Sequence, residues 1–280
     1  MTASASSRTT ARGTVIVHGV DFSGADGGGA AKIRVAEREL APRSAVRVRG
    51  RLDRAGLRRA ILDSVRDARV DGVRHLWRID APFGLPIACF ETERPEGLPA
   101  GPLDWSSVAR WVSAFPNARA WRTAMRESSR REPRRACDRE LHTPMAPMNL
   151  RVFKQTFTVI REILVPLADE GVAIMPVSMP ADGAAPSVAV CESCPASVLR
   201  ARGWPAKGYK GGGEPPRILR EEIIRLLRKD GLEIPSPAAV EAIHDAEGDL
   251  LDALLLATEP LSWTVPAEHA AQAAIEAWVY

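Results

Sequence analysis

The chain has 280 residues, of which 45% are hydrophobic and 26% are charged, and its formal net charge is +3. This balance excludes a disordered or membrane-embedded protein, and the length allows one large domain or two small ones. The mild positive charge is compatible with a polyanionic partner but does not require one.

The N-terminal segment, residues 1–13, is rich in Ser, Thr and Ala and lacks the apolar core of a secretory signal. We expect it to be a disordered tail ahead of a single domain over residues 14–280. The sequence contains no run of 18 or more apolar residues, the length that a membrane-spanning helix needs. Four cysteines are too few for a disulfide framework in a chain of this length. We therefore expect a cytoplasmic protein with free thiols and no membrane partner.

The first part of the chain predicts three antiparallel strands. Residues 14–24 (TVIVHGVDFSG) begin with a β-branched apolar run, which is typical of a central strand and ends at Asp21 before a glycine turn. Apolar residues then alternate with charged residues over residues 31–38 and again over residues 45–51. The glycine-rich turn between the first two segments favours a hairpin.

A helix and a parallel strand are predicted next. Asp53 can cap a helix that runs to about residue 69, because apolar residues recur there at helical spacing. The crossover leads to a strand over residues 73–80, and Pro82 helps to end that strand just after Asp80.

Residues 90–149 are irregular and rich in arginine, and we expect them to form a helical insertion over the active face. After this insertion the alternation of strands and helices resumes. The remaining predicted elements are a helix over residues 150–167, short strands over 172–177 and 188–191, a helix from Pro195, an amphipathic helix over 218–227, and a helix over 236–257 with an irregularity near Gly248.

Acidic residues follow or lie on four of these elements. Asp21, Asp80 and Glu192 each follow an apolar strand. Asp249 and Asp252 lie three residues apart on one face of the last predicted helix, whose other positions are mostly apolar. Carboxylates on such a helix are costly to bury unless they are paired, solvated or bound to metal. Ordinary helix capping and strand-end aspartates are the alternative interpretation.

A group of carboxylates like this suits Mg²⁺ or Mn²⁺, which prefer oxygen ligands. Two such ions can activate water and stabilise the leaving oxygen of a phosphodiester. The residues therefore predict a metal-dependent hydrolase, provided that the four carboxylate-bearing elements converge in the fold.

Five motifs carry a resemblance to the ribonuclease H-like superfamily and, within it, to a family of predicted nucleases described as domain of unknown function 429. They are GVDFSG at residues 19–24, IDAPFGLP at 79–86, CESCPA at 191–196, KGYKG at 207–211 and HDAEGDLLDALLLA at 244–257. Each motif is short, and their order and spacing over most of the chain carry the resemblance. The family implies an α/β fold with a mixed five-stranded sheet, three antiparallel strands followed by parallel βα units, and helices on both faces.

The resemblance also implies roles for the acidic residues. Asp21 matches the first-strand aspartate that bridges the metal ions in such enzymes, and Asp80 matches the acidic residue that ends the fourth strand. Asp249 and Asp252 match the acids of the terminal helix. Glu192 matches a recurrent glutamate of the uncharacterised family, to which the wider superfamily assigns no metal role. The implied activity is that of a nuclease acting on DNA or RNA.

Two basic segments are candidates for binding that nucleic acid. Lys207 and Lys210 lie in a glycine-rich loop that can approach a phosphate backbone closely. Arg122 and Arg126 belong to a run of arginines at helical spacing, which can contact phosphates along one helix face. A surface turn and a solvated arginine face are about equally good interpretations.

Two further features are weaker. Cys191 and Cys194 form an isolated CxxC ahead of Pro195, and ordinary free thiols are favoured over redox activity or zinc because no second Cys or His pair accompanies them. His244 is more readily explained as a capping or packing residue than as a metal ligand or a proton-transfer group.

The sequence is also compatible with two other functions. An actin-like or sugar-kinase-type phosphotransferase also begins with a strand, an aspartate and a glycine turn, but it usually needs a second such half, which the sequence lacks. A catalytically silent nucleic-acid-binding module would keep the fold without cleavage. The sequence does not distinguish DNA from RNA as substrate, nor a monomer from a homodimer.

Overall fold

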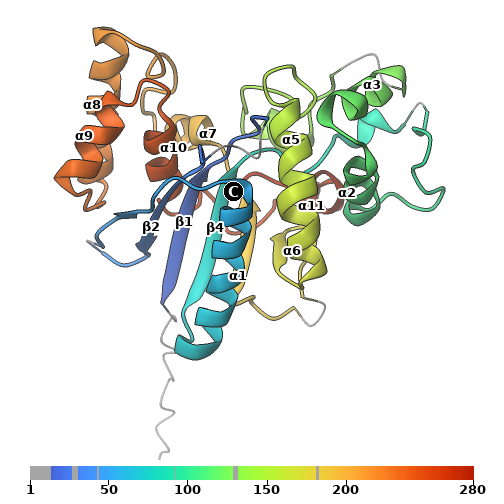
Figure 1. The fold of residues 1–280 in the computed structure, drawn as a ribbon, viewed down its shortest axis with the longest axis horizontal. Coiled ribbons are helices and arrows are strands. Elements are labelled where there is room, and N and C mark those ends of the chain that lie inside the picture. Colours follow the sequence, from blue (N-terminus) through green and yellow to red (C-terminus); the bar gives the residue numbers. More distant parts are fainter. Residues whose placement is uncertain (1–13, 27–30, 43, 92, 129–131, 181–182) are drawn as a thin grey trace, which may run out of the picture.

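A mixed six-stranded sheet runs through the molecule in the order β3-β2-β1-β4-β6-β5 (Figure 1). The strands are β1 (Val15–Asp21), β2 (Arg34–Glu39), β3 (Arg47–Val48), β4 (Arg74–Asp80), β5 (Ala173–Met175) and β6 (Val188–Glu192). The computed structural model describes residues 14–26, 31–42, 44–91, 93–128, 132–180 and 183–280. The predicted tail over residues 1–13 lies outside this part of the chain.

The strand directions confirm the predicted α/β class. β1 pairs antiparallel with β2, and β2 pairs antiparallel with β3. β4 runs parallel to β1, and the pairs β4–β6 and β6–β5 are also parallel. The expected count of five strands is wrong, because both short apolar segments after residue 170 form strands and β5 adds to the outer edge of β6.

Helices and helical turns lie between and after the strands. They are α1 (Arg54–Asp71), η1 (Ile87–Cys89), α2 (Trp105–Ala114), α3 (Ala118–Ser128), α4 (Ala136–Glu140), α5 (Phe153–Val159), η2 (Ile160–Leu164), α6 (Val165–Asp169), α7 (Pro195–Ala201), α8 (Glu214–Lys229), α9 (Ser236–His244), α10 (Asp249–Leu256), η3 (Ala267–His269) and α11 (Ala270–Glu276). Here η1 and η3 are 3₁₀ turns, and η2 is a π-helical turn between α5 and α6. No helix within these described ranges is long and apolar enough to cross a membrane.

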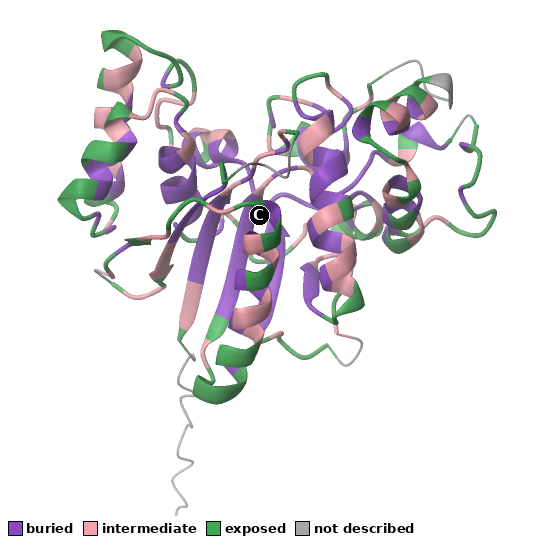
Figure 2. Ribbon diagram, viewed as in Figure 1, coloured by how far each residue is buried: buried purple, intermediate pink, exposed green. Residues whose placement is uncertain are grey.

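Helices cover both faces of the sheet, as consecutive residues of β4 demonstrate. The indole of Trp77 donates a hydrogen bond to the hydroxyl of Ser64 in α1. The guanidinium of Arg78 instead donates to the carbonyl of Leu256 at the end of α10. Because neighbouring side chains of a strand point to opposite faces, α1 and α10 lie on opposite sides of the sheet. Figure 2 shows both the central strands and α10 as buried.

The last predicted helix, over residues 236–257, is broken at the expected position. α9 ends at His244, and α10 begins at Asp249 directly after Gly248, whose φ is 77°. A residue with a side chain adopts this left-handed conformation only at a cost, so glycine suits the position. The break separates α10 from α9 and leaves Asp249 as the first residue of α10, where it lines the cavity described below.

The predicted insertion is part of the main core. α2 and α3 pack against η2 and α5, and their tryptophans belong to the same buried cluster as residues of β4 and α1. Residues 135, 138 and 143–145 of this region reach the cavity described below. The insertion therefore both extends the core and contributes one wall of the site.

Candidate metal centre

Two aspartates meet at one edge of the sheet because β1 and β4 are parallel. Asp21 is the last residue of β1, Asp80 is the last residue of β4, and the two are direct partners in the ladder. Asp80 lies two residues after Arg78 and so shares its face of the sheet, the face that α10 covers. The strand register thus places both carboxylates beneath the start of α10.

A glycine in β1 lets α10 come close to the strand. A Cβ atom at Gly19 would lie 2.1 Å from the carbonyl oxygen of Ala253 and 2.4 Å from the amide nitrogen of Ala257. Both atoms belong to the backbone of α10 and cannot move aside alone. This close approach brings Asp252, on the same helix, to the two strand-end aspartates.

We expect Gly19→Ala to destabilise the protein by about 2 to 3 kcal/mol, because α10 must move away from β1 as a whole. Chemical unfolding with urea would measure the change. Gly50→Ala is the matched control, since nothing lies within 4 Å of a Cβ built there. Equal stability of the two variants would contradict the proposed close packing.

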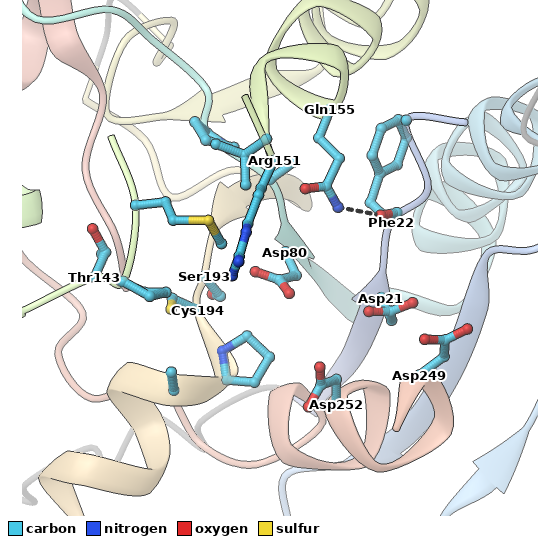
Figure 3. Close-up of a pocket in the computed structure, with 18 of the residues that line it drawn as sticks. Asp21, Phe22, Asp80, Thr143, Arg151, Gln155, Ser193, Cys194, Asp249 and Asp252 are labelled. Carbon is cyan, nitrogen blue, oxygen red and sulfur yellow. Dashed lines mark hydrogen bonds between the residues drawn. The ribbon is translucent and has the colours of Figure 1, made fainter. Parts of the chain in front are cut away.

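Three carboxylates form the centre of the site. Asp21, Asp80 and Asp252 each offer an oxygen, and these oxygens all lie within 4.8 Å of one another. Asp252 is buried, whereas Asp21 and Asp80 are half-buried and open towards a cavity (Figure 3). Neither Asp21 nor Asp80 accepts a hydrogen bond through its side chain from any residue that the structure describes.

Burial and like charges make the cluster electrostatically unfavourable without a metal ion, although Lys210 opposes part of the effect. Burial raises the pKa of Asp80 to about 8, and the charge of Asp252 adds to the shift. Burial likewise raises the pKa of Asp21 well above its ordinary value, and the other aspartates of the site contribute in the same direction. A bound divalent cation would compensate these like charges, and it would take the oxygen donors that the two half-buried aspartates leave free.

Asp252 already has two partners from the glycine-rich loop. The hydroxyl of Tyr209 donates to Asp252 Oδ1 over 2.8 Å, and Lys210 Nζ lies 2.5 Å from Asp252 Oδ2. Burial would lower the pKa of Lys210, but the attraction of Asp252 outweighs it and raises that pKa. Lys210, predicted to bind nucleic acid, therefore acts in this structure as the counter-charge of the acidic cluster.

Asp249 lines the same cavity one helical turn before Asp252 (Figure 3). It is half-buried, and burial followed by the charge of Asp245 raises its pKa. The four aspartates singled out in the sequence thus converge on one cavity, and three of them have oxygens within 4.8 Å of one another.

The molecule was also compared with known proteins. No protein-family model, curated protein or solved structure matches the chain. The geometry of the site and its chemistry therefore carry the functional argument by themselves.

Glu192 lines the cavity but its carboxylate is engaged elsewhere. It is the partner of Ile79 in the ladder, so it occupies the opposite face of the sheet from Asp80. Its two oxygens accept hydrogen bonds from Arg135 over 2.5 and 2.7 Å, and one also accepts from the amide of Phe83 over 2.7 Å. Burial raises the pKa of Glu192, and the positive charge of Arg135 opposes this increase. The arrangement makes Glu192 half of a buried ion pair at the edge of the site.

The other predicted basic residues are divided between the cavity and the surface. Lys207 lines the cavity and is exposed. Arg122, in α3, donates to the carbonyl of Met148 and pairs with Glu132 over 2.7 Å, and Arg126 is exposed on the same helix. Neither arginine is among the residues that line the cavity.

Three polar residues at the start of α5 and just before it were not predicted. Arg151, Lys154 and Gln155 line the wall of the cavity opposite α10, and the amide group of Gln155 donates to the carbonyl of Phe22 over 2.7 Å. The sequence signal for these residues is the polar first turn of a helix whose other face is apolar.

All four cysteines are free and buried. Burial raises the pKa of Cys194, at the cavity wall, to about 12.

Proposed function

We propose that this protein is a metal-dependent nuclease with a ribonuclease H-like architecture. The observation that carries the proposal is the convergence of Asp21, Asp80 and Asp252 at one point of a cavity. The succession of three antiparallel strands and then parallel strands, with an acidic residue at the ends of β1 and β4, supports the architecture.

The donor set fits Mg²⁺ or Mn²⁺. Asp21, Asp80 and Asp252 would hold the metal, with Asp249 available one turn away, and all four supply the hard oxygen ligands that these ions prefer. Bound divalent ions would supply a lowered pKa for water and a positive charge for the phosphate oxygens. Tyr209 and Lys210 orient the carboxylate of Asp252 through one contact to each of its oxygens.

The reaction is hydrolysis of a phosphodiester. The oxygen of a water molecule forms a bond to phosphorus, one phosphorus–oxygen ester bond breaks, and the leaving alcohol oxygen takes up a proton. No oxidant or reductant is consumed. The negative charge of the acidic cluster must be neutralised before the substrate can bind, because an uncompensated group of carboxylates would repel the phosphate.

A cleavage assay tests the proposal. Purified protein with Mg²⁺ or Mn²⁺ should cut at least one of single-stranded DNA, duplex DNA, branched DNA or an RNA–DNA hybrid, and EDTA should abolish cutting. Asp80→Asn should reduce the rate at least about 100-fold, because loss of a residue that only supports a metal ligand already costs 10- to 100-fold. The matched control is Asp63→Asn, a half-buried position of α1 that does not line the cavity.

Two outcomes would contradict the proposal. A wild-type protein that cuts no substrate with either metal would refute nuclease activity, and an Asp80→Asn variant as active as Asp63→Asn would refute the acidic cluster as the active site. Metal-dependent binding of nucleic acid without any cleavage would instead indicate a silent binding module.

A further inference from the structure

The acidic cluster lies at the base of a cavity with walls on several sides. The cavity has a volume of about 740 Å³. Its walls are formed by residues 22–25, 143–145, 192–196 and 206–210 and by the start of α5. Figure 3 shows Gln155, Phe22 and Arg151 on one side of Asp21 and Asp80, Asp252 on the opposite side, and Cys194 to the left.

This shape matches the sites of small molecules better than a groove for a long polymer. Pockets for small ligands have volumes of roughly 300 to 1,000 Å³ and bury most of the ligand. An interior phosphate of a continuous duplex could reach Asp21 and Asp80 only if the chain on both of its sides also left the cavity, whereas a strand end or a short molecule needs one opening.

Cations without partners surround the opening. Arg151, Lys207 and Lys32 line the cavity and are exposed, and none of them forms an ion pair with a described residue. The guanidinium of Arg151 points into the cavity towards Asp80 (Figure 3). By contrast, Lys154 pairs with Asp26, and Lys210 pairs with Asp252.

The walls also offer apolar surface between these charges. Pro82, Pro144, Met145 and Pro195 line the cavity and can pack against a base or a sugar. The combination of an acidic floor, free cations at the opening and apolar walls is complementary to a nucleotide unit, which carries an anionic phosphate and an apolar ring face.

We propose that the cavity binds one or two nucleotide units, presented as the end of a single strand or as a free dinucleotide, and that Arg151 binds a phosphate oxygen beside the cleaved bond. This inference rests on the proposed nuclease function and narrows its substrate. Arg151 is a binding residue here, and Lys207 is a second cation that lines the same cavity without an ion pair to a described residue.

Substrate topology tests the inference. A linear single-stranded 12-mer, the same sequence closed into a covalent circle, and a dinucleotide are incubated with the wild-type protein and Mn²⁺. We expect cleavage of the linear strand, of the dinucleotide or of both, and at least about tenfold slower cleavage of the circle. Cleavage of the circle at the rate of the linear strand would overturn the inference and leave nuclease activity established. Cleavage of none of the three would refute the inference, and the substrate panel described above would show whether nuclease function fails with it.

Variants of Arg151 provide the second measurement. Arg151→Gln should raise KM for the cleaved substrate about tenfold, because a hydrogen bond between two charged groups is lost. Arg151→Lys should restore part of the lost affinity, and Arg59→Gln, at an exposed position of α1 that does not line the cavity, should change KM less than twofold. Mn²⁺ affinity, measured by electron paramagnetic resonance, should be the same in all variants. Equal KM values for Arg151→Gln and Arg59→Gln would overturn the role of Arg151.

Discussion

Arg135→Met should destabilise the protein by about 3 to 5 kcal/mol, the cost of removing one partner of a buried ion pair. The side chains of Arg135, Glu192 and Asp138 are almost completely inaccessible to solvent. Arg135 pairs with Glu192 over 2.5 Å and with Asp138 over 2.9 Å, so its loss leaves two carboxylates buried without a cation. Methionine retains much of the side-chain volume, so the missing charge dominates the effect.

Urea unfolding of Arg135→Met and of Arg139→Met would separate this effect from the general cost of replacing an arginine. Arg139 is exposed and donates one hydrogen bond to a backbone carbonyl, so its replacement should cost less than about 1 kcal/mol. Adding Glu192→Gln to Arg135→Met should recover part of the stability, because the double variant buries one charge fewer. No recovery in the double variant would show that packing, and not charge, accounts for the loss.

The stability of the single variant Arg135→Met should depend on pH in a defined direction. Burial already raises the pKa of Glu192 above its ordinary value of 4.5, and without Arg135 that pKa would rise further. A raised pKa in the folded state means that the folded protein binds the proton more tightly than the unfolded chain. The resulting stability is present at low pH and is lost as the pH rises above 4.5. The deficit of Arg135→Met should therefore be smaller at pH 5 than at pH 8.

The strand ends that carry Asp21 and Asp80 could be predicted because their signals are local. β-branched runs mark β1 and β4, and each run stops at an aspartate followed by a turn residue. That two parallel strands end at the same edge is a general property of sheets, so the proximity of these two residues followed from the topology. The proximity of Asp252 to these two residues depends on a further condition, the close approach of α10 to β1 at Gly19. No local sequence pattern reveals this approach.

The surroundings of Glu192 could not be predicted for a different reason. In the sequence Glu192 resembles Asp80, since each follows an apolar strand. Which face a side chain occupies depends on the register between strands, and β6 pairs with β4 so that Glu192 lies beside Ile79. Its cation, Arg135, is 57 residues away and belongs to a segment that the sequence predicted only as an irregular insertion.

The order of the strands in the sheet could not be predicted from the sequence either. The sequence places the segment of β5 before that of β6, but β6 pairs with β4 and β5 lies outside it. A strand with three residues has little periodicity of its own, so neither its position nor its partner could be derived from the local sequence.

The role of Arg151 could not be predicted either. An arginine at a helix start is common on any surface, and only its position in the cavity distinguishes Arg151.

Asp21→Asn should have opposite effects on stability in the absence and in the presence of metal. Without metal, Asp21 shares a poorly solvated site with Asp80 and Asp252, and all three have raised pKa values, chiefly through burial. Replacing one carboxylate by a neutral amide of the same shape removes part of this repulsion. We expect the metal-free variant to be more stable than the wild type by about 1 to 2 kcal/mol, whereas most substitutions destabilise.

With metal the order should reverse. Mn²⁺ at 100 times its dissociation constant would stabilise the wild-type protein by about 2.7 kcal/mol, and the variant, lacking one of three ligands, would gain far less. Thermal unfolding with EDTA and with Mn²⁺ measures both values, and Asp63→Asn should follow the wild type in each. A misfolded variant would be less stable under both conditions, and a protein that binds no metal at this cluster would keep the variant more stable under both. Only a metal bound by Asp21 makes the two stability curves cross.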